Sequence, residues 1–252
     1  MIFLSATPLP LWFYIVWAIS ILVWLSNIAF RINSALRYLK AFNLVVSSLC
    51  IAGLLMELPF YLKPSFPKSN YEKLYVIGDS VSAGIGGTKE ETWPKILHKK
   101  YGINVVNLSK SGATVASAIR QAAQIKTENA MVFLEIGGND LFAPTPAKTF
   151  EESLKQILKK VSSPTRLVVM LELPLMPWDI KYGNIQRRLA KQFNVILIPK
   201  RFFVSVLAAK NATLDLAHLS QNGHQLMAEK IWSLIKPSIL STVKPNENQD
   251  SN

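Results

Sequence analysis

The stretch LYVIGDSVSAG, from Leu74 to Gly84, sets the fold of the central part of the chain. It begins as an apolar run with β-branched residues, which is typical of a buried strand, and it breaks at Gly78, Asp79 and Ser80. Small residues follow, so the chain turns at the end of the strand. Two interpretations are open: an ordinary strand-to-helix corner whose serine caps the next helix, or a turn that presents a reactive serine.

After this turn, short apolar runs alternate with helical patterns as far as residue 237. This alternation predicts an α/β domain with a mostly parallel sheet covered by helices on both faces. The expected strands are Leu74–Gly78, Asn104–Asn107, Met131–Ile136, Leu167–Glu172 and Val195–Ile198. The expected helices are Trp93–Tyr101, Val115–Gln124, Phe150–Val161, Ile185–Phe193 and Gln221–Ile235.

Candidate reactive residues follow the ends of these strands, where open parallel sheets bind their ligands. Ser80, Gly112 and Asn139 follow the first, second and third strands. The stretch DLAHLSQNGH places Asp215 three residues before His218, a spacing that lets a carboxylate orient the imidazole that deprotonates a serine. The backbone N–H groups of Ser80 and Gly112 and the amide of Asn139 are the expected donors to an oxyanion.

These residues carry a resemblance to a known family. The segments GDSVSAG, LSKSGAT, IGGND and DLAHLS occur in the order of the four conserved blocks of the SGNH/GDSL hydrolases. The surrounding sequence resembles the bacterial acyl thioesterase/lysophospholipase/arylesterase branch. The last block departs from the commoner Asp-Gly-x-His-Pro, although both of its catalytic positions are present.

The resemblance implies a flavodoxin-like three-layer α/β/α sandwich over residues 74–238. It implies that Ser80 is the nucleophile, that Asp215 and His218 are the acid and base, and that Ser80, Gly112 and Asn139 form the oxyanion hole. The expected activity is hydrolysis of acyl esters or thioesters. The loops after Asn139 and Glu172 are expected to wall the acyl site, which places five side chains in its lining: Leu141, Phe142, Leu175, Met176 and Trp178.

No metal and no cofactor are expected. The chain has one cysteine, Cys50, three histidines, and no pair of histidines in the HExxH pattern. The glycines that follow Ser80 lack the spacing of a dinucleotide-binding loop. Residues after 63 contain 24 Lys and Arg against 15 Asp and Glu, a net charge of +9 by subtraction. With a membrane tether, this charge favours an anionic lipid surface over nucleic acid as the partner.

The N-terminal quarter of the chain is apolar and predicts a membrane anchor. Half of all residues are hydrophobic and the mean hydropathy is +0.22. The uncharged run from Pro10 to Phe30 is long enough to cross a bilayer. A second run, from Ala41 to Leu62, contains Asn43, Ser47, Ser48 and Glu57. It is either a second span paired with the first, which we prefer, or a buried or interfacial helix.

The charge of the loop between these runs predicts the orientation. Arg31, Arg37 and Lys40 place this loop in the cytoplasm and the rest of the chain outside the bacterial inner membrane. One span instead of two would reverse the orientation. The resulting organisation is a transmembrane hairpin over 1–63, a linker over 64–73, the hydrolase domain over 74–238 and a disordered tail over 239–252.

Two other functions compete with acyl ester hydrolysis. One is removal of O-acetyl groups from an envelope polysaccharide, a reaction that the same family performs. The other is a non-enzymatic membrane-tethered module that has kept the fold. The presence of Ser80, Asn139, Asp215 and His218 together favours an enzyme.

Overall fold

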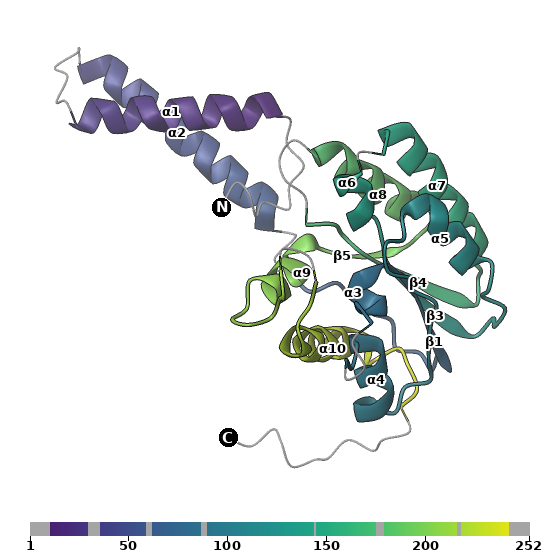
Figure 1. Cartoon of the computed structure of the whole chain (residues 1–252). Helices are drawn as coiled ribbons and strands as arrows, with labels where there is room; N and C mark the ends of the chain where they lie inside the picture. The colour runs from purple at the N-terminus through teal and green to yellow at the C-terminus, as the bar shows by residue number, and fades with distance from the viewer. Residues whose placement is uncertain are drawn as a thin grey trace. The chain divides into compact units, whose positions relative to one another are not determined.

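The computed structural model describes residues 11–29, 36–58, 62–86, 90–143, 145–174, 179–215 and 218–241 (Figure 1). They belong to two compact units. One lies within Met1–Lys63 and Leu175–Ile180, and the other within Pro64–Pro174 and Lys181–Asn252. The candidate catalytic residues all belong to the second unit, which we call the catalytic unit.

The first unit consists of helices α1 (Leu11–Ala29) and α2 (Leu36–Glu57), which pack against each other. The indole Nε1 of Trp17 donates to the Sγ of Cys50 at 3.2 Å. Large apolar side chains remain exposed on both helices, among them Leu22 at 63% and Leu44 at 69%.

The predicted pair of membrane spans over residues 10–62 is not supported. None of the helices described combines the length and the apolar character that crossing a bilayer requires. The apolar runs do form helices, but α2 contains Asn43, Ser47 and Ser48, so a continuous helix is not a continuous apolar segment. The side of a membrane on which the catalytic unit lies stays a prediction.

The catalytic unit is built on a five-stranded parallel sheet. Its strands are β1 (Lys73–Gly78), β2 (Val105–Asn107), β3 (Ala130–Glu135), β4 (Arg166–Leu171) and β5 (Ile196–Ile198), in the order β2-β1-β3-β4-β5. This order is that of flavodoxin-like folds, in which the order of the strands along the sheet changes direction between β1 and β3. All neighbours pair in parallel, with Val76 opposite Phe133 in the central pair. The predicted α/β class and parallel sheet are confirmed.

Helices cover both faces of this sheet. The helices of the catalytic unit are α3 (Ser80–Ala83), α4 (Trp93–Tyr101), α5 (Val115–Ala122), α6 (Gly138–Phe142), α7 (Ala147–Val161), α8 (Ile180–Gln192), α9 (Lys200–Leu207) and α10 (Gln221–Ile235). The contacts pair α4 and α9 with α10 on one side and α5 with α7 on the other (Figure 1). The helices α3, α6 and α9 were not predicted; α3 and α6 have only four and five residues and are too short to show a 3.6-residue repeat.

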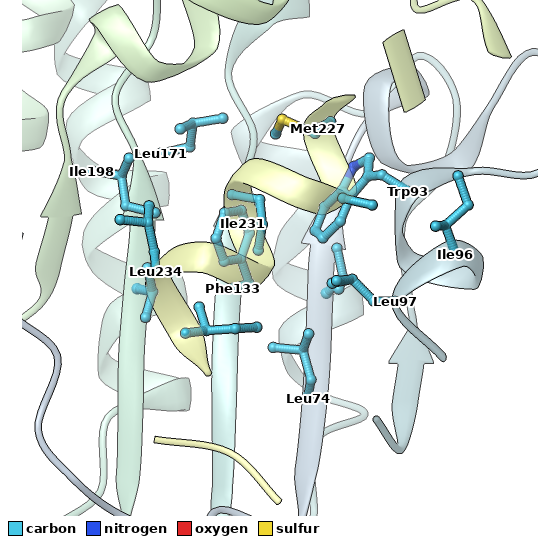
Figure 2. Packing of buried hydrophobic residues seen from close by; sticks show 14 of the residues in the cluster. Leu74, Trp93, Ile96, Leu97, Phe133, Leu171, Ile198, Met227, Ile231 and Leu234 are labelled. Atoms are coloured by element: carbon cyan, nitrogen blue, oxygen red, sulfur yellow. The ribbon is translucent and has the colours of Figure 1, made fainter. Parts of the chain in front are cut away.

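The strands are apolar on both faces because both faces are buried. Alternate side chains of each strand, such as Leu74 and Val76 of β1, point into the cluster under α4, α9 and α10. Figure 2 shows this cluster, in which Trp93 of α4 meets Phe133 of β3 edge to face at 5.3 Å. Full burial of a large apolar side chain contributes roughly 1.5–3 kcal/mol, so this layer holds the strand ends firmly.

The two ends of the catalytic unit are fastened to each other. Tyr71 N donates to Ser238 O at 3.0 Å, and Leu240 N donates to Tyr71 O at 2.9 Å. Ser69 N donates to Pro237 O, and the hydroxyl of Ser238 donates to the carbonyl of Pro67. Residues 239–241, assigned from the sequence to a disordered tail, therefore belong to the folded unit, and Ile239 is 5% exposed.

Candidate active site

The first element of the site is the turn that carries Ser80. Strand β1 ends at Gly78, and Asp79 caps α3 by accepting the N–H of Val81 on its Oδ1 at 3.0 Å. Ser80 is then the first residue of α3 and is half-buried. Gly78 has no room for a side chain, since a Cβ there would lie 2.8 Å from the Oγ of Ser82 and 2.9 Å from the carbonyl of Glu135. The strand can therefore pass close to β3 just before the serine.

A buried polar layer supports this turn from beneath. The hydroxyl of Ser82 donates to Oε2 of Glu135 at 2.7 Å and accepts the indole N–H of Trp93 at 3.2 Å. Glu135 is 4% exposed, and its burial raises its pKa well above the usual value. Loss of water makes the charged form costly, and the nearby Asp79 adds to the rise. Ser82 is thus structural, although it lies only two residues from Ser80.

The second element is the turn before α5, which holds Gly112. Gly112 has φ +74°, a left-handed conformation that favours glycine, and no atom of the described structure lies within 4 Å of the Cβ it lacks. The turn is tied to the Ser80 strand because Gln121 of α5 accepts the N–H of Gly78 and donates to its carbonyl, both at 3.1 Å. Lys110 N also donates to the carbonyl of Gly78.

The third element is Asn139 on α6. Its Nδ2 donates to the carbonyl of Ala113 at 3.0 Å and to Oδ2 of Asp79 at 3.3 Å. The amide is thereby held between the Ser80 turn and the Gly112 turn. Both of its hydrogens have acceptors, and the one to Asp79 is the longer bond. An oxyanion between the two turns would take the hydrogen that now points at Asp79.

The fourth element is the loop before α10, which carries Asp215 and His218. The Nδ1 of His218 lies 2.7 Å from Oδ2 of Asp215, and the backbone N–H of His218 donates to Oδ1 of the same carboxylate at 2.8 Å. Thr213 and Leu219 form an antiparallel bridge, and Leu214 N donates to the carbonyl of His218. The three-residue spacing thus closes a narrow bend in which one carboxylate fixes both the backbone and the ring of His218.

Electrostatics connect this loop with the Ser80 turn. Burial raises the pKa of Asp79 from its usual 3.8 to about 6. The N–H of Val81 and the charge of His218 act in the opposite direction, and Asp140 adds to the rise. Among the described residues, the charge of His218 is thus one of the groups that lower the pKa of Asp79, the residue before Ser80. The structure thus brings the turns of Ser80, Gly112 and Asn139 and the loop of His218 to one edge of the sheet.

The raised pKa of Asp79 predicts a specific dependence of stability on pH. Asp79 binds its proton more tightly in the folded than in the unfolded chain, so its contribution to the free energy of unfolding is fully present below about pH 3.8. Between about pH 3.8 and about pH 6, roughly 3 kcal/mol of that contribution is lost. We expect Asp79→Asn to remove this loss, as measured by urea unfolding between pH 4 and pH 8. The exposed Glu152→Gln variant is the control, and parallel curves for Asp79→Asn and the wild type would contradict the assignment.

The predicted acyl-site residues are only partly described. Leu141 is half-buried and Phe142 is 73% exposed, both on α6 next to Asn139. Leu175, Met176 and Trp178 lie outside the described residues. Their role as lining of an acyl site therefore stays a prediction.

Several residues organise the site through contacts that the sequence did not reveal. Asp79 stabilises the turn by accepting the N–H of Val81, and its contact with Asn139 could not be found from the sequence. Gln121 carried no motif. His224, which is 1% exposed, accepts the N–H of Trp93 on Nδ1 and lies 3.1 Å from Glu90. Glu90 in turn accepts the N–H groups of Ile85 and Gly86, so this pair holds the segment after the Ser80 turn.

The arrangement is that of α/β hydrolytic enzymes with a serine at a strand end. It combines a parallel sheet with a serine turn, a glycine turn, an asparagine and an Asp–His pair at the carboxyl edge. The sequence model of the GDSL-like Lipase/Acylhydrolase family matches residues 76–226. The chain belongs to this family and is an enzyme of the GDSL/SGNH esterase type. The resemblance stated from the four blocks is confirmed at this level.

Three relatives show where in the family the chain lies. It is 28% identical over 191 residues to the Thioesterase 1/protease 1/lysophospholipase L1 of Escherichia coli (strain K12), covering 71% of this chain and 91% of that protein. It is 26% identical over 180 residues to the Esterase TesA of Pseudomonas aeruginosa, covering 66% and 89%. It is 27% identical over 168 residues to an Arylesterase of Vibrio mimicus, covering 62% and 83%.

Solved structures agree with the fold. A crystal structure of TesA superposes with a TM-score of 0.57 at 26% identity and covers 66% of this chain and 98% of that one. The psychrotrophic esterase EstA from Pseudoalteromonas gives a TM-score of 0.58 at 22% identity and covers 66% and 97%. The matched parts leave out about a third of this chain.

Proposed function

We propose that the catalytic unit hydrolyses acyl esters or thioesters through Ser80, His218 and Asp215. The observation that carries the proposal is the Asp215–His218 pair, whose Oδ2 and Nδ1 lie 2.7 Å apart in the loop before α10. With Nδ1 engaged by the carboxylate, Nε2 is the ring nitrogen available as a base.

In the first half of the reaction, the Oγ of Ser80 attacks the acyl carbonyl carbon while Nε2 of His218 takes its proton. The carbonyl oxygen becomes an oxyanion, which the N–H groups of Ser80 and Gly112 and the Nδ2 of Asn139 stabilise. The tetrahedral intermediate then collapses, and the leaving alcohol or thiol takes the proton from His218. An acyl group remains on Ser80.

In the second half, water replaces the leaving group. His218 removes a proton from the water, which attacks the acyl carbon, and the same donors stabilise the second oxyanion. Collapse returns the proton to Ser80 and releases the carboxylic acid. Asp215 stays ionised throughout, because its role is to hold the ring and to stabilise the imidazolium.

The names of the relatives and the side chains near the site support a particular substrate class. The relatives carry names of thioesterase, lysophospholipase, esterase and arylesterase activities. Leu141 and the exposed Phe142 lie two and three residues after Asn139 on α6, so this edge of the site offers apolar surface to an acyl chain. We therefore propose acyl chains longer than acetyl as the preferred substrates.

A substrate panel tests this proposal. We expect kcat/KM for p-nitrophenyl esters to rise from acetate toward medium-chain acyl groups, with slow release of acetate from an O-acetylated polysaccharide. Each CH₂ that the site buries contributes about 0.8 kcal/mol, or roughly fourfold. A preference for acetyl groups, with efficient deacetylation of the polysaccharide, would replace the proposed substrate by an envelope glycan. Absence of turnover on every ester and thioester would leave a non-enzymatic module.

A further inference from the structure

The catalytic unit contains a second carboxylate–imidazole pair besides Asp215 and His218. Nε2 of His224 on α10 lies 3.1 Å from Oε1 of Glu90, and Nδ1 of His224 accepts the N–H of Trp93 at 3.3 Å. Because Nδ1 is an acceptor, the proton of the neutral ring lies on Nε2 and is donated to Glu90. Both ring nitrogens therefore have partners within the protein, and neither is left to take a proton from a substrate.

Burial fixes the charges of this pair. His224 is buried, and loss of water lowers its pKa, which favours the neutral ring. Burial alone would raise the pKa of Glu90, but the hydrogen bonds from His224, Ile85 and Gly86 lower it overall. The pair is therefore a hydrogen bond from a neutral imidazole to a carboxylate.

The carboxylate of Glu90 holds the backbone that leaves the Ser80 turn. Its Oε2 accepts the N–H of Ile85 at 2.9 Å and the N–H of Gly86 at 3.1 Å. Gly84 N donates in turn to Ser80 O at 2.9 Å. Gly84 has φ +80°, and a Cβ there would lie 2.6 Å from Oε2 of Glu90, so the carboxylate lies directly against this backbone.

A second contact fastens the same segment to α10. Gln221, the first residue of α10, accepts the N–H of Glu91 at 3.0 Å and donates to its carbonyl at 3.1 Å. Gln221 and His224 are three residues apart on α10, so they lie on one face of the helix. Residues 90–93 are thus bound to α10 at two successive points.

The first turn of α10 also supports the loop that carries His218. Ser220 caps α10 by accepting the N–H of Gly223, and its own N–H donates to Ala212 O at 2.9 Å. A Cβ at Gly223 would lie 1.9 Å from the same carbonyl, so the helix and the segment that leads into the loop are in direct contact. The start of α10 therefore holds both the loop of His218 and the segment that leaves the Ser80 turn.

We propose that Glu90 and His224 are positioning residues of the proposed reaction, and that their bond sets the place of the Ser80 turn relative to His218. The inference rests on the proposed function and adds two residues outside the Ser-His-Asp triad. Proton transfer from Oγ of Ser80 to Nε2 of His218 requires the two atoms at hydrogen-bond distance. A misplacement of about 1 Å between reacting groups costs on the order of 10²-fold in rate.

Two substitutions of His224 separate its bond to Glu90 from its contact with Trp93. The amide of His224→Gln reaches Glu90 as a donor, whereas the shorter amide of His224→Asn keeps an acceptor near Trp93 and loses Glu90. We expect kcat on a soluble ester to fall roughly 10- to 100-fold in His224→Asn and in Glu90→Ala, with little change in KM. His224→Gln should keep most of the wild-type kcat. Fluorophosphonate labelling of Ser80 should slow by the same factor as kcat, since it needs the same alignment.

The matched control is Glu91→Ala. The carboxylate of Glu91 pairs with Lys99, and only its backbone contacts Gln221, so kcat should not change. The double variant Glu90→Ala/His224→Asn should be no slower than the slower single variant, because both substitutions remove the same bond. Glu90 is half-buried and outside the apolar core, so Glu90→Ala tests the inference even where a His224 variant fails to fold.

Several outcomes would overturn the inference and leave the proposed function standing. They are a normal kcat in Glu90→Ala, equal losses in His224→Gln and His224→Asn, and additive losses in the double variant. A fall in kcat that only follows the folded fraction, measured by circular dichroism, would also overturn it. A wild type that cleaves no ester or thioester would overturn the proposed function and the inference with it.

Discussion

Ser80→Ala and His218→Ala are each expected to lower kcat by about 10⁴–10⁶-fold while leaving the fold intact. Within the described residues, the Oγ of Ser80 takes part in no hydrogen bond, so its removal leaves the cap of α3 by Asp79 in place. His218 is half-buried, and the backbone bridge between Thr213 and Leu219 does not need its ring. The measurements are kcat on a soluble ester and the circular dichroism spectrum and melting temperature of each variant.

Covalent labelling gives this prediction a second measurement. A fluorophosphonate probe should label the wild type and not Ser80→Ala, and labelling of His218→Ala should be slow because the serine keeps its proton. Ser82→Ala is the matched control. Ser82 is fully buried and donates to Glu135, so its substitution should lower the stability of the fold without removing the label. Labelling that persists in Ser80→Ala would assign the nucleophile to another residue. A folded His224→Asn enzyme as inactive as His218→Ala would show that the base is misassigned.

Asn139→Ala is expected to lower kcat by roughly 10²–10³-fold with a small change in KM, because the amide stabilises charge that develops only in the transition state. In the protein without substrate, its two hydrogens go to Ala113 and Asp79. If the hydrogen that Asn139 donates to Asp79 turns to an oxyanion, this hydrogen has an acceptor before and after the change. Little reorganisation of the amide is therefore needed as the negative charge forms. The measurement is the separation of kcat and KM on a soluble ester in the pH range where the enzyme is folded.

The control for this prediction is Asn129→Ala. Asn129 is an exposed asparagine before β3 whose amide contacts Asn70 and Glu72, and its loss should leave kcat unchanged. An Asn139→Ala enzyme with normal kcat would remove the amide from the oxyanion hole and leave it as a bridge between two turns. A fall in kcat matched by an equal loss of folded protein would also contradict the catalytic role.

The sequence predicted the sheet well because burial on both faces leaves a local signal. Each strand contains a continuous apolar run, and the bounds of the five expected strands agree with the observed ones to within one residue. The helices α4 and α10 were predicted at their observed bounds. Pro94 in the first turn of α4 and Gly102 in the left-handed conformation after it mark both ends of that helix.

The parts that could not be predicted depend on contacts between distant residues. The bond from Asn139 to Asp79 joins residues 60 positions apart, and that from His224 to Glu90 joins residues 134 apart. Nothing in the local pattern around Gln121 indicates that it binds Gly78, since a buried glutamine inside an amphipathic helix has no sequence signature. The membrane hairpin shows the opposite limit: apolar composition predicted helices, but it did not establish that they span a bilayer.

The fastening of residues 67–71 to residues 237–240 has a mechanical consequence. The chain enters the catalytic unit from its N-terminal neighbour at about residue 64, nine positions before β1 begins at Lys73. A pulling force on that entry is first carried by the hydrogen bonds of Ser69 and Tyr71 to the C-terminal segment. These bonds transfer the tension to the C-terminal segment. The strand that positions Ser80 therefore does not carry it.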